Sequence, residues 1–98
     1  MRNIKLTISY DGTRYSGWQF QKNGRSIQET IQKALAKVTG ESVHLTGSGR
    51  TDSGVHAAGQ VANFKTRSGL PVKNIQMALN RSLPRDIAIV KAEEEGES

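Results

Sequence analysis

The chain has 98 residues, no cysteine, 35% hydrophobic residues and a formal net charge of +5. This length suits one domain with a single modest core, and the lack of cysteine excludes a disulfide framework and a thiolate metal site. No apolar run approaches the ~20 residues that a membrane helix needs. The first residues run directly into a strand pattern and do not resemble a signal peptide. These features predict a soluble cytoplasmic domain.

The positive charge is concentrated in the first 92 residues. Four of the nine acidic residues lie in the last six positions, so residues 1–92 carry fourteen cations and five acids. A surplus of this size on a small body favours a polyanionic partner. Charge alone does not separate a nucleic-acid-binding domain from other basic domains.

The first half of the chain predicts a strand and a helix. Residues 3–10 alternate between apolar and polar side chains, which is typical of a half-buried strand. A polar loop ends near Arg25. Ser26 and Glu29 then form a capping-box pattern at the start of a helix, and Gly40 suits its end. The inner stripe of this helix would be Ile27, Ile31, Leu35 and Val38.

The second half predicts three more strands and a second helix. Residues 43–46 and 58–66 indicate strands on either side of a glycine-rich loop. Pro71 can open the second helix, whose inner stripe would be Val72, Ile75, Ala78 and Leu79. Residues 86–92 predict the last strand, with Ile87, Ile89 and Val90 as its apolar side chains.

The order of these elements is β-α-β-β-α-β, which predicts an α+β, ferredoxin-like fold. Right-handed crossovers would place both helices on one face of a four-stranded antiparallel sheet. Residues 1–92 would form this domain, and residues 93–98 would be an acidic tail or a truncation point.

The loop from Gly47 to Ala57 concentrates reactive residue types. It contains three glycines, an arginine, a threonine, an aspartate and a histidine. Glycine lets backbone and ligand approach closely, and loops of this kind position functional groups. In an arbitrary protein, the commoner roles would be a turn cap for Asp52 and a solvated charge for Arg50.

Four motifs resemble those of the tRNA pseudouridine synthase A family. They occur in the family's order and together cover nearly the whole chain. The motifs are Tyr10–Gln19 (YDGTRYSGWQ), Gly49–Ala57 (GRTDSGVHA), Gly59–Phe64 (GQVANF) and Ala78–Ile87 (ALNRSLPRDI).

The resemblance implies an enzyme that isomerises uridine to pseudouridine in the anticodon stem-loop of tRNA. It assigns the nucleophile to Asp52 and a base-flipping role to Arg50. It implies no metal and no organic cofactor, and a homodimer for the full-length protein. Family members are more than twice as long, with further active-site residues in the half that is missing here. We therefore expect weak activity or none from this chain alone.

Other residues are candidates for RNA contacts. Arg14, Lys22 and Arg25 lie in one polar loop and are suited to phosphate. Thr51 and His56 are further candidates within the catalytic motif. Thr51 can instead shape the loop through local hydrogen bonds, and His56 can be structural because a strand begins there.

Two questions stay open at the level of the sequence. Trp18, Tyr15 and Phe20 could stack on bases or anchor their loop onto the core. An RNA-recognition motif shares the element order and the charge, but it stacks bases on aromatics of its third strand, where residues 60–65 offer only one aromatic side chain. A small-molecule regulatory module shares the fold but does not account for the glycine-rich loop.

Overall fold

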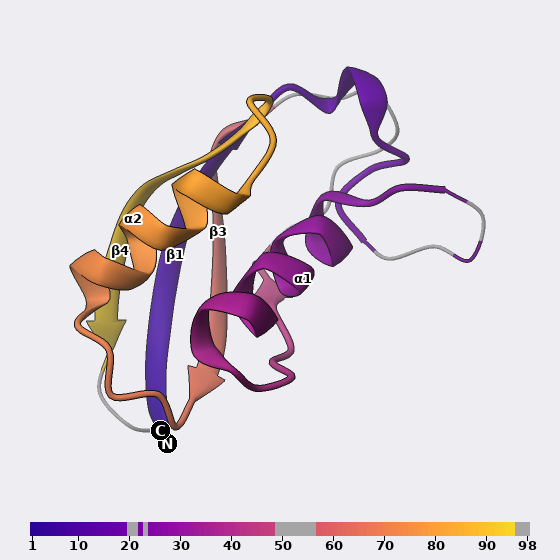
Figure 1. The fold of residues 1–98 in the computed structure, drawn as a ribbon. Coiled ribbons are helices and arrows are strands. Elements are labelled where there is room, and N and C mark those ends of the chain that lie inside the picture. Colours follow the sequence, from indigo (N-terminus) through magenta and orange to yellow (C-terminus); the bar gives the residue numbers. More distant parts are fainter. Residues whose placement is uncertain (20–21, 23, 49–56, 96–98) are drawn as a thin grey trace.

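The computed structural model describes residues 1–19, 22, 24–48 and 57–95. An antiparallel sheet of four strands, in the order β2-β3-β1-β4, carries two helices on one face (Figure 1). The expected α+β ferredoxin-like fold is confirmed. The elements are β1 (Arg2–Tyr10), the short 3-10 helix η1 (Gly12–Arg14), α1 (Ile27–Thr39), β2 (Thr46–Gly47), β3 (Ala57–Thr66), α2 (Val72–Ser82) and β4 (Ile87–Glu95).

The core lies between the helices and one face of the sheet. Alternating side chains of β1 are fully buried, whereas Lys5 and Thr7 on the other face are half-exposed. Val38 of α1 and Val72 of α2 pack against the core from its margin. The predicted inner stripes are therefore correct at most positions. The central buried side chains are Ile4, Leu6, Ile8, Ile27, Ile31, Leu35, Leu45, Phe64, Ile75, Leu79 and Ile89.

The ends of α1 follow the local sequence. The Ser26 hydroxyl accepts a hydrogen bond from the Glu29 N–H at 3.0 Å, which satisfies one of the free N–H groups of the first turn. The Glu29 carboxylate does not complete the expected capping box, because it pairs with Lys33 at 3.0 Å. Gly40 adopts a φ of 75°, a left-handed conformation that glycine accepts without strain, and ends the helix as predicted.

The second strand is shorter than the sequence indicated. Residues 43–46 were expected to form it, but β2 contains only Thr46 and Gly47. The reason is that α1 binds the backbone of Leu45. Gln32 accepts from the Leu45 N–H at 2.9 Å, and Gln28 donates to the Leu45 carbonyl at 2.8 Å. These backbone groups are therefore unavailable to β3.

Helix α2 binds the other edge of the sheet in a similar way. The Asn80 amide accepts from the Ile89 N–H at 2.8 Å and donates to the Ile89 carbonyl at 3.0 Å. Gln76 also donates to the carbonyls of Ile89 and Val90. The pairing of β4 with β1 shifts register here, and the Val90 side chain is 56% exposed, unlike those of Ile87 and Ile89.

The last strand continues beyond Ala92, where the sequence pattern placed its end. It runs to Glu95, and its acidic residues pair with β1. Glu94 forms an ion pair with Arg2 at 2.8 Å, and Glu95 accepts from the Asn63 amide at 2.7 Å across the sheet. Long-range partners thus order residues that look like a solvated tail in the sequence.

Glu41 ties the end of α1 to the end of β3. Its carboxylate accepts hydrogen bonds from the Thr66 hydroxyl and from the Arg67 N–H, the latter at 2.9 Å. These donors stabilise the charged form and hold the pKa of Glu41 below its usual value. The same logic applies to Glu94, whose pKa is lowered by the hydrogen bond from Arg2.

Trp18 fixes the position of Gly47. The indole ring is buried and lies 6.3 Å, centroid to centroid, from the ring of Tyr10. A Cβ atom added at Gly47 would lie 2.5 Å from the indole Nε1 and 2.7 Å from Cε2. Only glycine allows the backbone to approach the ring this closely.

We predict that Ser26→Ala lowers the free energy of unfolding by about 0.5 to 2 kcal/mol, because the partly buried N–H of Glu29 loses its acceptor. Chemical denaturation measures this difference. Ser42→Ala is the matched control, since Ser42 is exposed and lies outside the helices and strands. An equal effect of the two substitutions would contradict a formed cap.

We predict that Glu41→Gln destabilises the fold at neutral pH and has little effect in acid. A carboxyl group whose folded-state pKa is lowered stabilises the fold above its unfolded pKa, and this contribution is lost as the pH falls through the folded-state value. The difference in unfolding free energy between the parent and Glu41→Gln should therefore narrow below about pH 4. Urea unfolding at several pH values tests this, and a difference that is independent of pH would refute it.

We predict that Gly47→Ala displaces Trp18 and costs about 1 to 3 kcal/mol of stability through overpacking. Trp18 is the single tryptophan of the chain, so its fluorescence reports the displacement directly. Gly69→Ala is the control, because an added Cβ there meets no atom within 4 Å. Unchanged Trp18 emission in Gly47→Ala would show that the contact is not constraining.

Candidate catalytic loop and nucleic-acid interface

The four predicted residues of the catalytic motif, Arg50, Thr51, Asp52 and His56, lie outside the described residues. The structure does describe the chain on both sides of them. Residues 46–48 lead into this segment from β2, and Ala57 follows it as the first residue of β3. What the structure shows of the site therefore comes from these flanking residues.

The chain is firmly held where it enters the segment. Both the N–H and the hydroxyl of Ser48 donate to the Val61 carbonyl, at 2.9 and 3.1 Å. Gly47 pairs with Ala62 and lies against Trp18. On the far side, Ala57 pairs with Tyr10, which is itself stacked with Trp18. The two residues of this aromatic pair thus lie beside the two flanks of the segment that contains Asp52: the Trp18 ring lies against Gly47, and the Tyr10 backbone pairs with Ala57.

The polar loop before α1 is anchored to the core. Tyr15 and Trp18 are both 2% exposed, so they anchor the loop and are not available to stack on bases. Backbone hydrogen bonds join this loop to the start of α1, including those from the Ile27 N–H to Gly17 at 3.1 Å and from the Gln28 N–H to Trp18 at 2.9 Å. Phe20, the third aromatic of this loop, lies outside the described residues.

Tyr15 links this loop to the start of β4. Its hydroxyl donates to the Asp86 carboxylate at 2.8 Å. Burial, together with the hydrogen bond to Asp86 and the charge of that residue, raises the pKa of Tyr15 to about 12. The phenol is therefore a hydrogen-bond donor at neutral pH, and the Arg25 guanidinium lies 5.2 Å from the centre of its ring.

The three predicted phosphate-binding residues are all exposed but do not form one cluster. Arg14 lines a cavity of about 460 Å³ together with Arg85. Arg25 lines a separate groove of about 260 Å³, with Lys33 and Lys37 of α1. Lys22 is also exposed and lies between Arg14 and Arg25 in the sequence. The sequence pattern did not indicate a phosphate-binding role for Arg85, Lys33 or Lys37. The i, i+4 spacing of the two lysines nevertheless places them on one face of α1.

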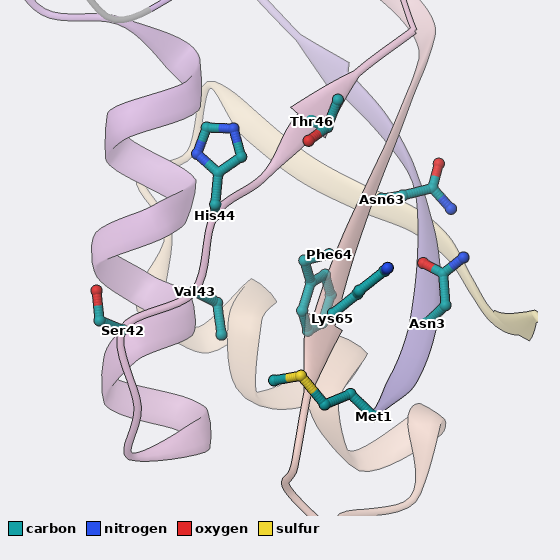
Figure 2. A pocket seen from close by; sticks show the side chains of 9 residues that line it. All are labelled: Met1, Asn3, Ser42, Val43, His44, Thr46, Asn63, Phe64 and Lys65. Atoms are coloured by element: carbon teal, nitrogen blue, oxygen red, sulfur yellow. The ribbon is translucent and has the colours of Figure 1, made fainter. Parts of the chain in front are cut away.

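Another cavity, of about 410 Å³, lies at the outer edge of β3 (Figure 2). It opens where residues 42–45 turn away from β3, and its polar lining includes His44, Asn63 and Lys65. Phe64 also lines it but is 2% exposed. The third strand therefore offers no exposed aromatic platform, which argues against an RNA-recognition motif.

Two kinds of site are absent from the part of the chain that the structure describes. No group of three or more His, Cys, Asp or Glu side chains is arranged there to hold a metal ion. No helix there is long and apolar enough to span a membrane.

The chain is similar to curated proteins with one common name. It is 59% identical over 97 residues to tRNA pseudouridine synthase A 2 of Clostridium perfringens. This alignment covers 99% of this chain and 40% of that protein. It is 60% identical over 94 residues to tRNA pseudouridine synthase A of Caldicellulosiruptor bescii, and 54% identical over 94 residues to that of a Thermoanaerobacter species. Each of these two alignments covers 96% of this chain and 38% of the relative.

The chain thus spans about two fifths of the length of the curated relatives that it matches. The sequence pattern described as tRNA pseudouridine synthase matches residues 6–98, from the middle of β1 onward and including the whole segment around Asp52. The chain therefore belongs to the tRNA pseudouridine synthase family.

Proposed function

We propose that this chain is the catalytic portion of a longer enzyme that isomerises uridine to pseudouridine in tRNA, with Asp52 as the nucleophile. The observation that carries the proposal is the family match over residues 6–98, which includes the segment Arg50-Thr51-Asp52. The hydrogen bonds of Ser48 and the pairing of Ala57 support it, because they fix both ends of a short segment that must hold a carboxylate in register with its substrate.

The reaction requires no oxidant, reductant or second substrate. The bond between N1 of uracil and C1′ of ribose breaks, a bond between C5 and C1′ forms, N1 gains a proton and C5 loses one. A carboxylate suits this exchange because it can form a covalent adduct and then leave. Asp is also ionised at pH 7, since its ordinary pKa is about 3.9.

A uridine in a stacked stem-loop must leave the stack before Asp52 can reach it, which costs a few kcal/mol. We assign Arg50 to this step, since a planar, charged guanidinium two residues before the nucleophile can occupy the vacated position. Thr51 and His56 would contact the RNA or shape the segment around Asp52. Arg14, Lys22 and Arg25 would contact phosphates, and their exposure in the structure is compatible with that role.

The remaining parts of the proposal concern the longer protein. This chain covers 40% of the first of these relatives, and we propose that the rest of the longer protein supplies further active-site groups, so that the 98-residue chain alone turns over little or no tRNA. We also propose the anticodon stem-loop as the target, a homodimer as the working assembly and the cytoplasm as its location. These assignments rest on the family resemblance.

We predict that Asp52→Asn abolishes pseudouridine formation when it is placed in a chain that also carries the C-terminal portion of the relatives. Asn has the shape of Asp but cannot form the same ester, so folding and tRNA affinity should stay close to those of the parent. Tritium release from C5-labelled tRNA measures turnover, and thermal unfolding and filter binding provide the controls.

Two results would contradict this assignment. One is an Asp52→Asn enzyme that converts uridine at the parental rate. The other is a variant that loses activity because it no longer folds, which would return Asp52 to the role of a turn cap.

A further inference from the structure

A basic band runs over the helical side of the molecule. One part is the groove between α1 and the C-terminal end of α2, where Arg25, Lys33 and Lys37 contribute positive charge. The other part is the cavity beside η1, with Arg14 and Arg85. Pro84 lines both parts, so the groove and the cavity adjoin. We call these five cations and the surface between them the helical band.

The acidic residues of the helical band are engaged within the protein. Glu29 pairs with Lys33, Asp11 accepts from the N–H and hydroxyl of Thr13, and Asp86 accepts from the Tyr15 hydroxyl. Among the described residues, no ion pair is formed by Lys37, Arg14 or Arg85. The band has five cationic and three acidic side chains, and a phosphate can bind at Lys37, Arg14 and Arg85 without displacing a structural ion pair.

The open face of the sheet differs. Its cations are Lys5, Lys65 and Lys91, and acidic side chains of β4 lie among them. Glu93 is 3.6 Å from Lys91, and Glu95 is held by Asn63. This face thus carries three cations and two acidic side chains, a surplus of one charge, whereas the helical band has five cations and three acidic side chains, a surplus of two.

One end of the helical band is close to Ala57, where the chain leaves the catalytic segment. The Asp11 N–H donates to the Asp86 carbonyl at 2.9 Å, which joins the two chain segments that line the cavity beside η1. The preceding residue, Tyr10, pairs with Ala57, where the chain leaves the segment that contains Asp52. A strand of nucleic acid that follows the band would therefore be led toward the catalytic segment.

We propose that the helical band binds the sugar–phosphate backbone of the tRNA outside the uridine that reacts, through Lys33, Lys37 and Arg85 in addition to Arg14 and Arg25. This inference rests on the proposed function and extends it from the catalytic loop to a docking path for the substrate. The contacts would be independent of sequence and would set the register of the RNA. The apolar side chains in the groove are small or buried, as with Ala34 and Leu83, so insertion into a lipid surface does not fit.

The test compares two triple variants of the full-length protein in binding to an unmodified tRNA transcript over a range of salt concentrations. The band variant carries Lys33→Gln, Lys37→Gln and Arg85→Gln. The matched control carries Lys5→Gln, Lys65→Gln and Lys91→Gln on the open sheet face. Each set removes three charges, and each breaks one surface ion pair.

Each phosphate contact contributes about 0.7 to 0.9 to the slope of log affinity on log salt. The band variant should therefore lose about 2 units of slope, whereas the control should lose less than about 0.5. A third variant, with Lys33→Arg, Lys37→Arg and Arg85→Lys, keeps the charges and should bind like the parent. It also guards against a loss of binding caused by misfolding.

Several outcomes would overturn the inference. Equal losses in the band and control variants would indicate a general effect of net charge, and an unchanged slope in the band variant would mean that the helices face away from the RNA, toward an acidic protein or solvent. Failure of the proposed function looks different, because the parent protein would then show no salt-dependent tRNA binding or Asp52→Asn would stay active.

Discussion

Side-chain amides from each helix bind the backbone of the nearest sheet edge, and the point where the chain enters the segment that contains Asp52 depends on the bonds at the β2 edge. Gln28 and Gln32 hold the N–H and carbonyl of Leu45, and Asn80 holds those of Ile89. Backbone groups in or near the core must be paired, because an unpaired one costs about as much as a lost hydrogen bond. The amides meet this requirement where no further strand is present, and they fix each helix against its edge.

The consequence at the β2 edge concerns the catalytic segment. Because α1 takes the backbone of Leu45, pairing with β3 is confined to Thr46 and Gly47. The chain then passes Trp18 at a distance that only glycine permits and is bound again through Ser48. The segment that contains Asp52 thus starts from a point set by a helix, an aromatic ring and a strand. A nucleophile that must act at a defined distance from its substrate benefits from such support.

The loop before α1 contributes in two ways. Its buried aromatics, Tyr15 and Trp18, make it part of the core, and the hydrogen bond from Tyr15 to Asp86 joins it to the start of β4. Its exposed cations, Arg14 and Arg25, are accessible to an anionic partner. Buried aromatic residues and exposed cations thus lie in one segment, so the packing of Tyr15 and Trp18 helps to position the backbone that carries the cations. Cations on a rigid backbone lose less conformational entropy on binding.

The sequence determined the features that depend on local pattern. The cap at Ser26, the stop at Gly40 and the inner faces of both helices follow from periodicity and backbone conformation within a few residues. The family motif around Asp52 is also local, and it identifies the candidate nucleophile without coordinates. The roles of Arg50, Thr51, Asp52 and His56 stay predictions, since these four residues lie outside the part of the chain that the structure describes.

Only the tertiary structure decided the features that depend on distant partners. The length of β2 depends on glutamines at least 13 residues earlier in the chain, and the order of Glu94 on an arginine 92 residues away. Trp18 is buried, and Arg14 and Arg85 line one cavity, only because the folded chain brings distant segments together. The physical reason is that periodicity encodes which face of an element is apolar, whereas the partner of a polar group is set by segments that meet only on folding.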